Sequence, residues 1–244
     1  MSKKLVEDYD AWDRYPQYRW VYNKLELALK LGYRAGPACV PPYSTGMFCV
    51  RPIYNLYGMG IGSHKVFLRG REDASAINGH MFIPPGYFWC EWFEGDHYSV
   101  DYEWVRGGKG GIHDHWQATC TVKGEPGDDL AHFARWVKVK DIRLTLPPFL
   151  QSLQEVDRIN IEWKVKGFHS NIIEIHLRSG GDLAQDPIGT EMIPHWSSDD
   201  SAYIQALIDD GWAYFKNRDG EIYNASGHIK DPRIGYLTKH SNTS

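Results

Sequence analysis

The sequence has little of what would direct it to a nucleic acid, a membrane or the secretory route. Its 27 Lys and Arg residues are outnumbered by 31 Asp and Glu residues, which gives a formal net charge of −4 and no indication of nucleic-acid binding. No apolar run approaches the length that crosses a bilayer. Residues 1–15 lack the apolar centre of a secretion signal. We therefore expect a cytoplasmic protein with no membrane partner.

Cysteine is also scarce. The four cysteines, Cys39, Cys49, Cys90 and Cys120, show no CxxC spacing, so they are expected to be reduced, buried thiols and not a disulfide framework or a thiolate metal site. Internal repeats and low-complexity linkers are absent as well. A chain of 244 residues, 42% of them hydrophobic, can bury a core in one domain or in two tightly fused lobes.

Spacing of the apolar residues predicts a mixture of helices and strands. Helical spacing marks residues 18–31, with Gly32 as the stop, and helices are also predicted over 128–135, 149–156 and 200–216. Alternation or aromatic content predicts strands over 48–52, 65–68, 86–93, 98–105, 112–122 and 136–139. The tail from Lys239 onward is expected to be disordered. Mainly antiparallel hairpins with a few helices indicate an α+β fold.

A further hairpin over residues 159–182 places two carboxylates face to face. If Val165 pairs with Asn171, then Glu162 faces Glu174, and His176 projects from the same face. Like charges directly opposite each other destabilise a sheet, so a positive group is expected between them. Carboxylates with an imidazole suit Mg²⁺ or Mn²⁺. The plain alternative is a solvent-facing hairpin whose charges are hydrated.

A glycine-rich segment follows the strand that ends at Arg51. Gly58, Gly60 and Gly62 would let backbone N–H groups approach an anion closely, and Lys65 begins the next strand. The spacing matches neither a Walker loop nor a dinucleotide fingerprint. A phosphate site between two cations and a plain turn both fit this segment.

Four segments in this order resemble the ATP-grasp superfamily over residues 22–182. They are YNKLELALKLGYRAGP, FCVRPIYNLYGMGIGS, EWFEGDHYSVDYEW and INIEWKV with NIIEIHLRSGGD. The resemblance implies two lobes of mainly antiparallel sheet with helices and a nucleotide cleft between them. It divides the chain into a helical segment and linker (1–46), an ATP-binding lobe (47–106) and a metal-binding lobe with a C-terminal extension (107–244).

Carried over by position, the resemblance implies ATP and Mg²⁺ (or Mn²⁺) as cofactors. Glu162, Glu174 and His176 would bind the metal, with His176 in the place of a family Asn, and Arg178 would stabilise the transferring phosphoryl group with help from Arg51. The nucleotide would be bound by Lys24, Arg51, Gly58, Gly60, Gly62, Ser63, Lys65, Cys90, Glu91, Trp92 and Phe93, with Glu91, Glu94 or His97 near the ribose.

The implied activity joins a carboxylate to an amine, in small molecules or peptides, through an acylphosphate. Because only a short segment precedes Tyr22, a homo-oligomer or a partner could supply the acceptor site. That short segment and the replacement of Asn by His176 leave an alternative, a nucleotide-binding or structural module that has lost catalysis. A zinc hydrolase built on His113 and His115 is a third hypothesis.

Overall fold

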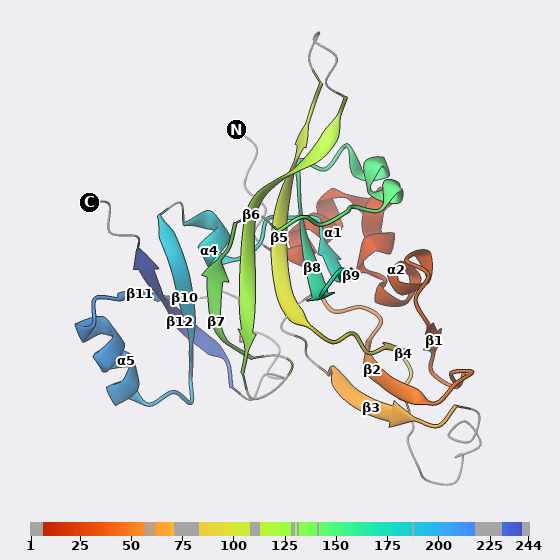
Figure 1. Ribbon diagram of the computed structural model, residues 1–244, viewed down its shortest axis with the longest axis horizontal. Coiled ribbons are helices and arrows are strands. Elements are labelled where there is room, and N and C mark those ends of the chain that lie inside the picture. The colour runs from red at the N-terminus through yellow and green to blue at the C-terminus, as the bar shows by residue number, and fades with distance from the viewer. Residues whose placement is uncertain are drawn as a thin grey trace.

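The computed structural model describes residues 7–56, 60, 62–70, 83–107, 113–127, 130, 132–140, 142–186, 188–217 and 231–240, with the backbone alone at 182 and 185. Its described strands form two sheets (Figure 1). Every strand pair described in them is antiparallel. The expected α+β class is therefore confirmed.

The smaller sheet contains β1 (Ala35–Pro37), β2 (Gly46–Pro52), β3 (His64–Leu68) and β4 (Tyr87–Glu91). Its strand order is β1-β4-β2-β3. A buried cluster on this sheet contains Phe48, Val50, Leu68 and Trp89, from β2, β3 and β4. Aromatic and aliphatic side chains of this kind favour strands.

The larger sheet contains β5 (Asp96–Val105), β6 (His115–Pro126), β7 (Phe133–Lys138), β8 (Arg158–Lys166), β9 (His169–His176), β10 (Gly189–Trp196), β11 (Ala213–Lys216) and β12 (Arg233–His240). Its order is β11-β12-β10-β7-β6-β5-β8-β9. The change of sheet falls between β4 and β5, so residues 96–105 belong to the larger sheet, whereas the expected lobe 47–106 grouped them with the smaller one.

Helices cover one face of the larger sheet. They are α1 (Asp8–Arg14), η1 (Pro16–Tyr22), α2 (Lys24–Lys30) and η2 (Pro148–Leu153), while α4 (Asp182–Gln185) and α5 (Ser201–Asp209) lie further along the chain. Ile159, Ile161 and Trp163 of β8 are buried in the main core with Val21 and Leu27 of the first helices. The residues between them on β8 therefore point to the opposite face.

The helix predicted over 18–31 is divided at Asn23. The Asn23 side chain accepts a hydrogen bond from the Glu26 backbone N–H at 3.1 Å and so caps α2, and Gly32 with φ of 77° follows its end. Among the described residues no helix is long and apolar enough to cross a membrane.

Several local predictions are wrong. The helix predicted over 128–135 is contradicted from Phe133 onward, because Phe133 and Arg135 lie in β7 and pair with β6. The strand predicted from Trp136 is confirmed. The helix predicted over 200–216 ends at Asp209 and is followed by β11. Disorder from Lys239 onward is contradicted at Lys239 and His240, which pair with β10. Cys39 is exposed, and of the four cysteines only Cys90 is fully buried.

Candidate functional site

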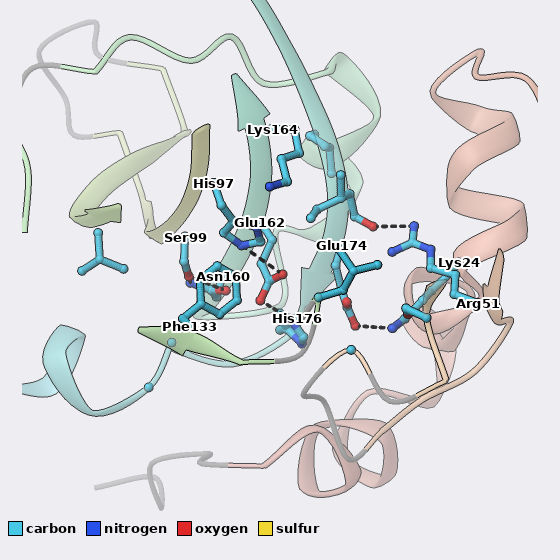
Figure 2. A pocket seen from close by; sticks show the side chains of 18 of the residues that line it. Lys24, Arg51, His97, Ser99, Phe133, Asn160, Glu162, Lys164, Glu174 and His176 are labelled. Carbon is cyan, nitrogen blue, oxygen red and sulfur yellow. Dashed lines mark hydrogen bonds and ion pairs between the residues drawn. The ribbon is translucent and has the colours of Figure 1, made fainter. Parts of the chain in front are cut away.

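A cavity of about 330 Å³ is lined by residues of both sheets and of α2 (Figure 2). The residues expected from the sequence that line it are Lys24, Arg51, Gly60, Ser63, Cys90, Glu91, Trp92, Phe93, His97, Glu162, Glu174, His176 and Arg178. The fold thus brings together groups that are far apart in the chain.

Three expected residues do not line the cavity. Gly62 is not a lining residue, although Gly60 and Ser63 are. The Lys65 ammonium lies 4.6 Å from the Trp92 ring centroid, and Glu94 is exposed and pairs with Lys166 at 2.7 Å. Gly58, also expected at the nucleotide site, lies outside the described residues.

The β8–β9 hairpin has the predicted pairing of its carboxylates but a different turn. Glu162 pairs with Glu174, as expected, yet Val165 pairs with Ser170 and not with Asn171. The turn is tighter than expected because Gly167 adopts a positive φ of 60°. A bulge beside Glu162 shifts the register by one residue, and this shift restores the carboxylate pair.

Two cations approach this hairpin from the helical and small-sheet side. Nζ of Lys24 lies 2.7 Å from Oε1 of Glu174. Arg51 on β2 donates a hydrogen bond from Nη2 to the carbonyl of Ile173 at 2.8 Å, at the bulge, and its guanidinium lies 5.4 Å from the Phe88 ring centroid. The positive group expected between the carboxylates is thus supplied in part by the protein itself.

Glu162 lies between two imidazoles. Its Oε2 is 3.4 Å from Nε2 of His97, and its Oε1 is 3.7 Å from Nε2 of His176. Burial favours the neutral carboxyl, but interactions with His176 and His97 outweigh it and hold the pKa of Glu162 well below its usual range. Glu162 is therefore an anion at neutral pH.

Asp8, which no sequence pattern singled out, fixes the other side of His176. Its buried carboxylate lies 2.8 Å from Nδ1 of His176 and 3.0 Å from Nε of Arg178. Burial opposes the charged imidazole, yet the Asp8 charge raises the pKa of His176 to about 10. A carboxylate on one imidazole nitrogen is the usual support for a metal ligand, since it orients the ring and leaves the other nitrogen for the ion.

The donor set suits a hard divalent cation. One ligand atom from each of Glu162, Glu174 and His176 can be chosen so that all lie within 4.8 Å of one another. Two carboxylates face each other there, and Nε2 of His176 points at one of them. These residues fit Mg²⁺ or Mn²⁺, provided that the ion displaces the His176 proton.

His113 and His115 show no comparable arrangement. Nδ1 of His115 lies 2.9 Å from the backbone carbonyl of His113. Within the described part of the chain they belong to no group of three potential metal ligands. The zinc hypothesis therefore has no support from the geometry.

A second carboxylate on the cavity wall was also missed. Asp101 on β5 accepts hydrogen bonds from the Gly180 backbone at 2.6 Å and from Nδ2 of Asn160 at 3.0 Å. Burial raises the pKa of Asp101, against the effect of these hydrogen bonds. The period-two pattern of the β5 sequence was the one signal that could have found it, since Asp101 lies between the apolar residues Val100 and Tyr102.

Comparison with known proteins gives structural matches only. No family model and no curated protein matches the sequence. N5-carboxyaminoimidazole synthetase from Staphylococcus aureus is 10% identical, with 91% of this chain and 68% of that chain covered and a TM-score of 0.52. The complex of this synthetase with ADP is also 10% identical, with 91% of this chain and 68% of that chain covered and a TM-score of 0.51. N5-carboxyaminoimidazole ribonucleotide synthetase from Thermus thermophilus is 12% identical, with 97% and 75% covered and a TM-score of 0.51.

These matches concern the architecture. At such low identity they show the fold alone, and the matched structures are ATP-grasp proteins. They span about nine tenths of this chain. This chain has the fold of the ATP-grasp superfamily.

Proposed function

We propose that this protein is an ATP- and Mg²⁺-dependent ligase that joins a carboxylate to an amine. The observation that carries the proposal is the group of Glu162, Glu174 and His176 beside Lys24 and Arg51 in one cavity. Matched structures named as synthetases, one of them complexed with ADP, support it. We expect small-molecule or peptide substrates and a cytoplasmic location.

Different residues of the cavity would bind the nucleotide and the metal ion. Lys24 and Arg51, from α2 and β2, would bind the nucleotide phosphates, and the backbone of Cys90 to Phe93 would receive the adenine. Glu162, Glu174 and His176 would hold Mg²⁺, which neutralises phosphate charge. Gly60 and Ser63 lie on the same cavity and would close over the phosphates.

Arg178 would act on the transferring phosphoryl group. Asp8 holds its guanidinium through Nε and Nη2, at 3.0 and 3.1 Å, so the side chain is positioned before any substrate binds. The acceptor carboxylate oxygen would attack the γ-phosphorus, and ADP would leave. The amine would then attack the acyl carbon of the acylphosphate, lose a proton and release phosphate.

Calorimetric titration with a non-hydrolysable ATP analogue, with and without Mg²⁺, tests the proposal. Wild type should bind the analogue more tightly with Mg²⁺, and Glu174→Gln should lose that difference. Asp96→Asn is the matched control, because Asp96 also pairs with a lysine, Lys123 at 2.8 Å, but outside the cavity. Equal Mg²⁺ dependence in wild type and Glu174→Gln would refute the metal assignment.

A nucleotide-binding module without catalysis is the second candidate. It is favoured by His176, whose charged imidazole is stabilised by Asp8 and would oppose a cation. Analogue binding without ADP formation, tested with mixtures of carboxylates and amines, would support this module. Acceptor-dependent ADP formation would exclude it.

A further inference from the structure

The face of the larger sheet that carries the metal ligands continues onto neighbouring strands. Ser99 on β5 lies opposite Glu162 on one side and opposite Val122 of β6 on the other. In the next row, Asp101 lies opposite Asn160 and Cys120. Directly opposite residues share a face, so Val122 and Cys120 extend the surface of the carboxylates away from Lys24 and Arg51.

A cluster of rings comes next on this face. Gly124 lies between His97 of β5 and Trp136 of β7 in the register, and it has no side chain to separate them. The two ring centroids are therefore only 5.6 Å apart, and Phe133 packs 4.7 Å from His97 and 4.4 Å from Trp136. A Cβ on Gly124 would lie 2.7 Å from the Phe133 ring.

The cavity wall changes from charged to apolar across the sheet. The described lining residues on β6, β7, β10, β12, α4 and the loops beside β6 and β7 are Cys120, Val122, Pro126, Leu130, Phe133, Trp136, Leu183, Ala184, Met192, Pro194, Trp196 and Arg233. Arg233 is the one charged residue among them. Val122, Leu183 and Met192 form a buried apolar cluster against which Trp136 packs.

The rings keep surface available to a ligand. Phe133, Trp136 and Trp196 are only half-buried, and all three line the cavity. Lys24 and Glu174 line the same cavity as Met192 and Trp196. A ligand with its reacting group beside the metal ligands therefore has an apolar wall beside the rest of it.

We propose that the carboxylate acceptor carries an apolar, ring-sized group that lies over Val122, Trp136 and Met192. The carboxylate itself lies at the Glu162 end, where the phosphoryl donor would be. Val122, Trp136 and Met192 offer no charged group. A second charge placed over these three side chains would lose hydration without a charged partner among them, whereas an apolar ring gains from leaving water. The inference rests on the proposed ligase function for the identity of the ligand as an acceptor.

Binding of two carboxylates to the full chain tests this inference. 3-Phenylpropionate and propionate share the reacting group and differ in the ring, and their affinities can be measured by calorimetry with Mg²⁺ and the ATP analogue present. Wild type should bind 3-phenylpropionate at least about tenfold more tightly. Trp136→Ala should remove that preference, and Trp136→Phe should retain most of it. Trp104→Ala, which removes an equal ring packed on Trp116 away from the cavity, should leave it unchanged.

Failure of the inference differs from failure of the ligase function. Equal affinity for the two acids in wild type, or a preference that survives in Trp136→Ala, would overturn the apolar subsite. ADP formation stimulated by short or doubly charged acids but not by 3-phenylpropionate would also overturn it and leave the ligase standing. A ring preference in a protein that binds no ATP analogue would support the subsite and refute the ligase. The wild-type comparison of acids decides the matter even if Trp136→Ala does not fold.

Discussion

Nζ of Lys24 lies 2.7 Å from Oε1 of Glu174, and the two side chains are only 6% and 15% exposed. The pair joins the first turn of α2 to β9, so a residue expected to bind phosphate contacts one expected to bind metal. The lysine offsets the repulsion between Glu174 and Glu162, which lie opposite each other in the hairpin. A metal ion would take over that role and release the ammonium to a phosphate.

Lys24→Met should therefore strengthen binding of Mn²⁺ alone by about tenfold, because it removes a competing positive charge from Glu174. Mn²⁺ affinity can be measured from the electron paramagnetic resonance signal of the free ion. Binding of the ATP analogue should weaken in the same variant. Lys30→Met is the control, since Lys30 pairs with Glu26 at 3.8 Å on the exposed side of α2. Weaker Mn²⁺ binding in Lys24→Met would contradict the idea that the metal ion replaces the Lys24 ammonium beside Glu174.

Asp8→Asn should destabilise the fold by about 3 kcal/mol or more, because it removes the buried carboxylate that contacts both the buried His176 and the half-buried Arg178. Urea denaturation measures the change in free energy of unfolding. Asp13→Asn is the matched control on the same helix: its carboxylate is 82% exposed and 3.7 Å from Arg19, so the change should stay within about 0.5 kcal/mol. Similar values for the two variants would mean that the Asp8 network contributes little.

Gly95→Ala should cost much more stability than Gly86→Ala. Both glycines have positive φ, 115° and 84°, so both variants carry backbone strain of about 1 kcal/mol or more. A Cβ on Gly95 would also meet the backbone of Val165, whose carbonyl carbon would be 2.6 Å away, whereas Gly86 has open space within 4 Å. Because both variants carry the backbone strain, the difference between their losses in free energy of unfolding measures the clash of the new Cβ at residue 95 with the Val165 backbone. Gly95 and Val165 lie where β5 pairs with β8. Equal losses would show that this contact relaxes easily.

Asp231→Asn should lower stability at neutral pH but not in acid. Burial would raise the pKa of Asp231, yet hydrogen bonds from Ser198 and Ser197 outweigh it and lower the pKa. A carboxylate whose pKa falls on folding stabilises the protein above its unfolded pKa of about 3.9 and loses that contribution as pH falls through the folded pKa. The difference between wild type and Asp231→Asn, from thermal unfolding at several pH values, should be constant near neutral pH and shrink below about pH 4. A stability difference between wild type and Asp231→Asn that grows as the pH falls would show that folding does not lower the pKa of Asp231.

Much of the fold could be predicted from local pattern. Alternation along β8 and β9 gave both the burial of Ile161 and Trp163 and the common face of Glu162 and Glu174. The reason is that side-chain direction in a strand repeats every two residues, whatever the rest of the chain does. The strands β2 to β6 and the α+β class were found in the same way, and the order of motifs was sufficient to identify the ATP-grasp fold.

The remaining features depend on pairings between distant segments. Phe133 and Trp136 are three residues apart, a spacing that favours one face of a helix. Pairing with β6 and β10 makes the segment a strand instead, and a register shift in the β6–β7 pairing lies between these two residues. The tail at Lys239 and His240 is ordered because β10 provides its hydrogen bonds. Neither partner is visible in the local sequence.

The sequence by itself determined which residues of the hairpin share the functional face, because that depends only on the period of a strand. Only the tertiary structure brought Asp8 to His176, 168 positions away in the chain, and Lys24 to Glu174. Such ion pairs depend on how helices pack on a sheet, and no periodicity encodes that packing. The apolar wall beyond Val122 was likewise decided by strand order, which places β7 and β10 beside β6.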